Sequence, residues 1–184
     1  MNGKEKDDLN PKITTALDAL NGLWSIEPPR YAKPTYNPNI YNGECVSFVK
    51  RFTEELGVKM NPMGGNGGAK YGFINFNKPG SSLSAEQADK IRFSGSEQPK
   101  IGDIIFFDST PTNKWGHVGV VSSVFDNGSI EIQESNLDGE APNTQVKRRR
   151  INNLSNTHPG RVMGWLRLKP VSYTHLTLPT KDGG

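Results

Sequence analysis

The chain of 184 residues contains one cysteine, Cys45, and three histidines. A disulfide framework is therefore excluded, and the scattered histidines give no ligand spacing of a zinc site, so we expect no metal. No apolar stretch is long enough to cross a bilayer, and the charged first eight residues lack the apolar core of a secretory signal. We therefore expect no membrane insertion, and no signal peptide is visible.

Two further segments lack what a ligand-binding motif needs. The glycine-rich run 63–68 has neither the lysine nor the strand-to-helix context of a phosphate-binding loop, and it is predicted to be a flexible loop. The basic run 147–150 has no nucleic-acid-binding motif or aromatic platform beside it, and it is interpreted as the solvated side of an edge strand. We therefore expect no cofactor and no nucleic acid as a partner.

What is present indicates one domain of short strands with a few helices. The sequence has 20 glycines and 13 prolines, and 33% of its residues are hydrophobic, which favours strands joined by turns over a helix bundle. Asn10 and Pro11 predict the start of a first helix. Its apolar stripe consists of Ile13, Leu17, Leu20 and Trp24.

A second helix is predicted to begin near Gly43 and to end at Gly57. Its inward face is expected to hold Phe48, Val49, Phe52 and Leu56. The residues expected off that face are Lys50, Arg51, Glu54 and Glu55. Cys45 lies at the N-terminal end of the inward face, and a helix N-terminus favours the thiolate, which is the nucleophilic form of cysteine.

The second half of the chain predicts a sheet. Residues 81–98 are polar and are expected to be irregular, whereas the apolar run Ile104–Phe107 predicts a strand buried on both faces. Two more strands, His117–Phe125 and Ile130–Asn136, flank the dipeptide Asn127-Gly128. This dipeptide predicts a two-residue hairpin turn, which would pair Phe125 with Ile130.

With that turn, Val121 would face Glu134 and Gly119 would face Asn136. Because side chains alternate along a strand, His117 would share one buried face with Glu134 and Asn136. A buried carboxylate and a buried amide need polar partners, and His117 is the natural one. A thiol, an imidazole and a polar group that orients the imidazole are the parts of a cysteine hydrolase.

Several segments taken together resemble the CHAP domains, which are cysteine- and histidine-dependent amidohydrolases and peptidases that cut amide bonds in peptidoglycan. The resemblance extends from about Tyr41 to Leu168. It is carried by Gly43 to Val49, Gly102 to Phe107, Gly116 to Val121, Ile132 to Asn136, and Gly164 to Arg167. The resemblance implies an α+β class and a papain-like (NlpC/P60-like) fold, with N-terminal helices packed on a small antiparallel β-sheet.

The resemblance also implies roles for four residues. Cys45 corresponds to the nucleophile, His117 to the general base and then acid, Glu134 to the residue that orients His117, and Asn136 to an accompanying polar group. The idealised hairpin places Asn136 nearer to His117 than Glu134, whereas the family usually gives the orienting role to the acid. The order of Glu134 and Asn136 is therefore left open.

Residues around the nucleophile differ from many relatives. Where these have glutamine before the nucleophile, this chain has Glu44, so backbone N–H groups at the helix head are the expected donors to an oxyanion. By position, we expect Tyr41, Glu44 and Trp115 to contact the substrate. The calcium loop of some phage relatives is rich in aspartate, but residues 35–40 hold no carboxylate, so we expect no calcium there.

The predicted function is hydrolysis of an amide bond in bacterial peptidoglycan, by an N-acetylmuramoyl-L-alanine amidase or an endopeptidase that forms a thioester on Cys45. One alternative is an NlpC/P60-type peptidase, whose usual Asp-Cys-Ser-Gly motif is not matched here. Another is a non-catalytic wall-binding or phage structural module. We expect a monomer that acts on the bacterial cell wall, either outside the cell or after release by a phage.

The expected domain organisation has three parts. Residues 1–30 are expected to form an N-terminal helical extension, and residues 31–169 the CHAP catalytic domain. Residues 170–184 have no place in the expected sheet and are interpreted as a non-native or disordered tail.

Overall fold

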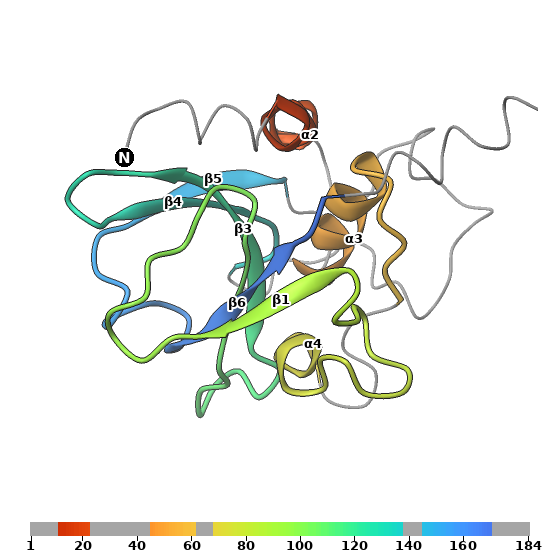
Figure 1. Ribbon diagram of the computed structural model, residues 1–184. Helices are drawn as coiled ribbons and strands as arrows, with labels where there is room; N and C mark the ends of the chain where they lie inside the picture. Colours follow the sequence, from red (N-terminus) through yellow and green to blue (C-terminus); the bar gives the residue numbers. More distant parts are fainter. Residues whose placement is uncertain (1–10, 23–44, 62–67, 138–144, 171–184) are drawn as a thin grey trace, which may run out of the picture.

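The computed structural model describes residues 11–22, 45–61, 68–137 and 145–170. The helices in these residues are α2 (Pro11–Leu20), α3 (Cys45–Glu55) and α4 (Tyr71–Ile74). The strands are β1 (Ala88–Arg92), β2 (Ile104–Phe107), β3 (His117–Val124), β4 (Ile130–Glu134), β5 (Lys147–Ile151) and β6 (Val162–Leu168). They form one curved sheet in the order β1-β6-β2-β3-β4-β5, in which all neighbours are antiparallel (Figure 1). The predicted α+β class is confirmed.

Helix α3 ends where the sequence predicts, and residues 43 and 44, near its predicted start, lie outside the described residues. It begins at Cys45, and Gly57, with a φ of 73°, follows its last turn in the left-handed region that glycine adopts readily. Phe48 and Phe52 on its inward face are buried. Arg51 was expected off that face and is nevertheless buried. Because α3 contacts both β3 and α2, more of its circumference is covered than in a helix packed on one side.

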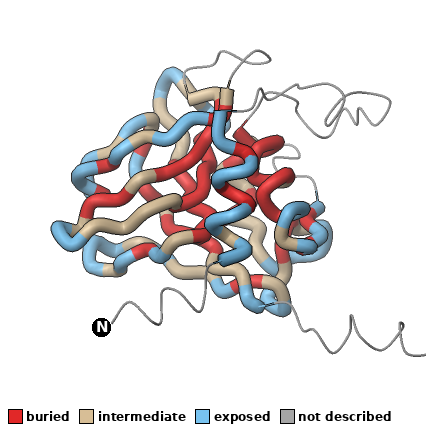
Figure 2. Tube along the Cα trace, turned by 90° about the horizontal axis from the view of Figure 1, so that it is seen from above, coloured by how far each residue is buried: buried red, intermediate tan, exposed pale blue. Residues whose placement is uncertain are grey.

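The sheet separates two apolar clusters because successive side chains of a strand point to opposite faces. Ile104, Phe106 and Val120 lie in the cluster that also contains the buried face of α3. Ile105 and Trp165 lie in the second cluster, on the other face. Figure 2 shows the buried chain running through the middle of the sheet and through α3, with the exposed segments outside. The first helix, α2, joins the α3 cluster through Leu17 and Leu20.

The hairpin between β3 and β4 has a longer loop than predicted. The Phe125 N–H donates to the Ser129 carbonyl at 2.9 Å, and the Gly128 N–H donates to the Phe125 carbonyl at 3.0 Å. Gly128 has a φ of 85°, so this is a type I turn followed by a left-handed residue, a common three-residue hairpin loop. The predicted pairing of Phe125 with Ile130 is therefore wrong, and Val124 takes that place.

A second irregularity, between Val121 and Ser123, moves the register by one more residue. Val121 therefore pairs with Ile132, and not with Glu134 as predicted. A slip of two residues keeps every side chain on the same face. It places Glu134 at the level of Gly119, where an added Cβ would lie 3.4 Å from the Glu134 Cβ. Glu134 is thus closer to His117 than the idealised hairpin allowed.

Of the two strands at the edges of the sheet, the sequence predicted one and missed the other. Strand β5 is at one edge, as interpreted from the basic run 147–150. Strand β1 forms the other edge and lies within residues 81–98, which were expected to be irregular. Its pairing with β6 along the whole of β1 explains the difference, because strand formation depends more on such pairing than on local sequence.

Candidate active site

Cys45 is the first residue of α3, as the sequence predicts, and its side chain is free and buried. The 11 residues of α3 extend away from it, so the sulfur lies at the positive end of the helix dipole. That end of a helix favours a thiolate over a neutral thiol. Cys45 as a whole is 7% exposed, so most of the residue is sheltered from solvent.

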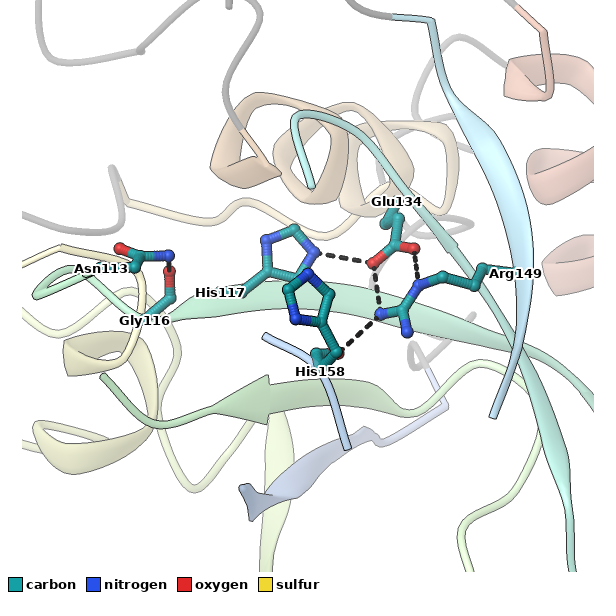
Figure 3. A network of polar contacts seen from close by, with 6 residues as sticks. All are labelled: Asn113, Gly116, His117, Glu134, Arg149 and His158. Carbon is teal, nitrogen blue, oxygen red and sulfur yellow. Dashed lines mark hydrogen bonds and ion pairs between the residues drawn. The ribbon is translucent and has the colours of Figure 1, made fainter. Parts of the chain in front are cut away.

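His117 is the first residue of β3 and is only 2% exposed. It pairs in register with Phe107 at the end of β2, and the two rings lie 5.7 Å apart between centroids. Its Nε2 lies 2.7 Å from Oε1 of Glu134 (Figure 3). This contact occupies one ring nitrogen, so Nδ1 is the nitrogen left for Cys45.

The electrostatics of His117 link it to both expected partners. Burial alone would lower the pKa of His117, but attraction and a hydrogen bond to Cys45, together with the hydrogen bond to Glu134, raise it to about 9. The imidazole therefore keeps its proton at neutral pH, which is the state that stabilises a thiolate beside it. The structure thus brings together the three residues that the sequence singled out as nucleophile, base and acid.

Glu134 ends β4 and is held from both sides. Burial raises its pKa, but hydrogen bonds from His117 and Arg149 outweigh burial and keep the pKa below the usual value. Arg149 of β5 donates from Nε to Oε2 at 2.5 Å and from Nη2 to Oε1 at 3.1 Å. Because an ionised carboxylate only accepts hydrogen bonds, Nε2 of His117 is the donor toward Glu134. The tautomer of His117 is thereby fixed.

Asn136 lies two residues beyond Glu134, after the end of β4, with a φ of 55°. Asparagine tolerates this left-handed conformation better than most residues, which suits the point where the chain leaves the sheet. Asn136 is half-buried and has a polar interaction. Nε2 of the imidazole forms its hydrogen bond with Glu134, so of the two residues left open by the sequence, the acid is the one at that nitrogen.

Trp115 lies two residues before His117 and is 51% exposed, the one large hydrophobic side chain so exposed in the described part of the chain. Asn113 braces the segment between them: its Oδ1 accepts from the Trp115 N–H at 3.0 Å, and its Nδ2 donates to the Gly116 carbonyl at 3.2 Å. Lys114 lies over the Trp115 ring, with its Nζ 4.5 Å from the centroid. The indole is thus exposed on a segment that these contacts hold in place just before His117.

Several predicted features fall outside the described residues. Tyr41, Glu44 and residues 35–40, where no calcium is expected, lie outside the described residues, as do 63–67 of the glycine-rich run and the tail 171–184. Within the described ranges, no three His, Cys, Asp or Glu side chains are grouped so that they could hold a metal ion. No helix there is long and apolar enough to cross a membrane.

Arg149 is the member of the cluster that the sequence analysis missed. It belongs to strand Lys147–Ile151, and the basic run of this strand predicts only a solvated side. In the register of β5 with β4, Arg149 pairs with Ile132 and lies diagonally from Glu134 on the same face. The signal that could have found it is the alternation of this strand, combined with a buried Glu134 that needs a cationic partner.

Comparisons with known proteins agree with this arrangement. The family model "CHAP domain" matches residues 35–136, more than half of the chain and the part that contains Cys45, His117 and Glu134. No curated protein matches the sequence.

Several solved structures share the fold. The crystal structure of Ly7917 has a TM-score of 0.56 at 19% identity, covering 85% of this chain and 61% of that one. Ly7917 with the hydrolyzing product of MDP gives 0.56 at 20% identity, covering 86% and 62%. The wild-type endolysin LysIME-EF1 gives 0.52 at 14% identity, covering 92% and 66%. This chain therefore spans about three fifths of the length of Ly7917. On the match of the family model, the chain belongs to the CHAP domain family.

Proposed function

We propose that this protein is a peptidoglycan hydrolase that cleaves an amide bond of the cell-wall peptide with Cys45 as its nucleophile. The observation that carries the proposal is the buried contact of His117 with both Cys45 and Glu134, in a chain of the CHAP family. The fold shared with an endolysin supports a wall substrate. The proposed site of action is accordingly the bacterial cell wall.

In the first half of the proposed reaction, the Cys45 thiolate attacks the carbonyl carbon of the scissile amide and a carbon–sulfur bond forms. Negative charge develops on the carbonyl oxygen, and the proposed hydrogen-bond donors to this oxygen are backbone N–H groups at the start of α3. The imidazolium of His117 then gives its proton to the leaving nitrogen. The carbon–nitrogen bond breaks, the amine departs, and an acyl thioester remains on Cys45.

In the second half, neutral His117 removes a proton from water, and the hydroxide attacks the thioester carbon. The carbon–sulfur bond breaks, the carboxylic acid product leaves, and the thiolate and imidazolium are restored. Glu134 takes no proton in this scheme. Its role is to hold the Nε2–H tautomer and to stabilise the imidazolium in both halves.

Substrate contacts are proposed from position. Trp115 offers an exposed indole face two residues from His117, which suits the apolar face of a sugar or a peptide side chain. Asn136 is proposed to be an accompanying polar group of the site. Tyr41 and Glu44 are proposed to contact the substrate. The catalytic domain is proposed to comprise residues 31–169 and to act as a monomer without a metal or cofactor.

The experiment that tests the proposal is digestion of purified peptidoglycan by the wild-type chain and by Cys45→Ala. We expect the wild type to release new amino groups and Cys45→Ala to release none, while both unfold at similar temperatures. Equal release by both proteins would exclude Cys45 as the nucleophile. Failure of the wild type to release any amino group, while it still binds the wall, would favour the non-catalytic wall-binding module.

Mass spectrometry of the released fragments identifies the bond. An N-acetylmuramoyl-L-alanine amidase frees the amino group of the first stem residue and leaves a carboxyl group on the sugar. An endopeptidase leaves that first residue attached to the sugar and frees an amino group farther along the peptide. The same measurement separates an amidase from an NlpC/P60-type peptidase.

A further inference from the structure

Arg149 forms a side-on fork with the carboxylate of Glu134, and this contact is additional to the backbone pairing of strand β5. The strand already pairs with β4 over five residues through the backbone. The Arg149 side chain lies in addition across the end of β4, with Nε on one carboxylate oxygen and Nη2 on the other. Figure 3 shows the guanidinium and the imidazole on opposite sides of the Glu134 carboxylate.

The fork fixes the orientation of the Glu134 carboxylate as well as balancing its charge. An arginine fork and a carboxylate are both planar, and two parallel hydrogen bonds hold them in one plane. With Oε2 taken by Nε and Oε1 shared with Nη2, the direction of the remaining acceptor on Oε1 is set toward Nε2 of His117. A carboxylate on a flexible glutamate would otherwise rotate about its last bond.

The fork is itself anchored. Nη2 of Arg149 also donates to the backbone carbonyl of His158 at 3.0 Å, in the segment between β5 and β6. The guanidinium is therefore held by a carboxylate and by a carbonyl of the backbone, and its side chain is only 24% exposed. The position of the carboxylate is thus tied to two further segments of the chain.

We propose that Arg149 is a positioning residue of the active site, whose guanidinium fork holds the Glu134 carboxylate in the orientation that His117 requires. The inference rests on the proposed function, because it concerns how the same imidazole is kept in place. The charged and titratable groups that face Glu134 are His117 from β3, Arg149 and the paired Lys147 from β5, and Cys45 of α3 beyond the imidazole.

The chain offers a matched control on the same strand. Arg150 carries the same charge one residue away, but its guanidinium binds the Ser129 hydroxyl and lies 3.6 Å from the centroid of the Phe125 ring. Arg150→Met therefore removes an equal charge and a comparable set of contacts from β5 without touching the Glu134 carboxylate.

The experiment compares Arg149→Met, Arg149→Lys and Arg150→Met with the wild type in amino-group release from peptidoglycan. We expect Arg149→Met to lower the rate about 10²-fold, the loss that a small misplacement of a catalytic group causes. Arg149→Lys keeps a charge but not the fork, so we expect its rate to stay well below that of the wild type. Arg150→Met is expected to keep the wild-type rate.

The second readout is alkylation of Cys45 by iodoacetamide across acidic pH, which reports on one residue because the chain has one cysteine. Without the fork, the Glu134 carboxylate can turn away from Nε2 of His117, so the imidazolium is held less firmly beside Cys45 and stabilises its thiolate less. We expect the acid-side fall in alkylation to begin at higher pH in Arg149→Met than in Arg150→Met. A purely structural role would lower the folded fraction without moving this profile.

Two results would overturn the inference. One is a rate and an alkylation profile of Arg149→Met equal to those of the wild type. The other is full recovery of hydrolysis in Arg149→Lys, because charge alone would then suffice; that variant also serves should Arg149→Met fail to fold. Cys45→Ala separates the two proposals: if it still hydrolyses peptidoglycan, the proposed function fails, whatever Arg149 does.

Discussion

Two buried carboxylates in this molecule are held by arginine forks, and they differ in what occupies the third side. Asp103, before β2, accepts from Nε of Arg167 at 2.9 Å and from Nη2 at 2.7 Å, and also from the backbone N–H of Lys100 at 2.7 Å. Glu134 has an equivalent fork from Arg149, but its third donor is the imidazole of His117.

This difference separates a structural ion pair from a candidate catalytic one. Burial raises the pKa of Asp103 despite its donors, whereas the hydrogen bonds to His117 and Arg149 hold the pKa of Glu134 below its usual value. The donors to Asp103 are Lys100, in a turn, and Arg167, in strand β6, so its contacts join two parts of the fold. An arginine fork is therefore not a sign of function by itself. The third donor to the carboxylate distinguishes the two cases: a backbone N–H for Asp103 and the imidazole of His117 for Glu134.

The largest expected effect is on activity, in Glu134→Gln. The amide still fills the space but no longer stabilises the imidazolium or fixes its tautomer. We expect hydrolysis of peptidoglycan to fall by about 10²- to 10⁴-fold, as when the orienting acid of a triad is replaced. The measurement is the initial rate of amino-group release, with circular dichroism to show that the fold is kept. Wild-type activity would make Glu134 equivalent to Asp103.

The reciprocal change, Asp103→Asn, should affect stability and not chemistry. It leaves Arg167 without its charged partner in a site where Asp103 is 1% exposed. We expect the free energy of unfolding to fall by about 3 kcal/mol, the low end for breaking a buried pair, because the Arg167 side chain is still 31% exposed. Urea unfolding measures the loss. A large drop in the rate per folded molecule would count against a purely structural Asp103.

The pH dependence of hydrolysis is expected to report on the contact between Glu134 and His117. His117 has a pKa of about 9 that depends on contacts with Cys45 and Glu134, and the leaving amine needs its proton. Activity should therefore hold through neutral pH and fall as the pH rises through about 9. In Glu134→Gln the imidazolium loses an anionic partner, so this alkaline fall should move to lower pH. An unmoved alkaline limb in that variant would mean that Glu134 does not set the protonation of His117.

A smaller effect is expected for Arg167→Lys, which keeps the charge beside Asp103 but loses the fork. The free energy of unfolding should fall by about 1.5 kcal/mol, the value of one lost hydrogen bond to a charged group. Hydrolysis by the folded protein should be unchanged, in contrast to Arg149→Lys. Thermal unfolding and the hydrolysis rate, measured on the same sample, test this contrast.

The smallest effect is expected for Trp115→Ala, outside both carboxylate clusters. Because the indole is 51% exposed, its loss should leave stability within about 0.5 kcal/mol of the wild type. If the indole contacts the substrate, KM should rise about fivefold with little change in kcat. An unchanged KM would remove Trp115 from the proposed substrate contacts.

Features that depend on local sequence could be predicted. The apolar spacing after Cys45 predicted the inward face of α3, and the glycine at 57 predicted its C-terminal end. The apolar run at 104–107 predicted β2 with both faces buried. The basic run at 147–150 identified an edge strand. The pairing of Cys45 with His117 followed from these elements because each residue begins its own element, α3 or β3.

Features that depend on strand register and on tertiary contacts could not be predicted from the sequence. Asn127-Gly128 fits a two-residue turn as well as the three-residue loop that forms, and the irregularity after Val121 has no local signal. The longer loop and the irregularity together shift the pairing of Glu134 by two residues. The predicted face of Glu134 was therefore right, but its contact with His117 could not be predicted. Arg149 was hidden because a run of four basic residues does not show which one meets a buried acid.

The central claim is that the sulfur of Cys45 is the attacking atom, and the single cysteine of the chain allows a direct measurement. Samples alkylated to increasing extents would be assayed for peptidoglycan hydrolysis, with the labelled fraction read by intact mass. The account predicts that activity falls in proportion to the labelled fraction and reaches zero at one label per chain. Fully labelled, folded protein that still hydrolyses peptidoglycan would contradict it.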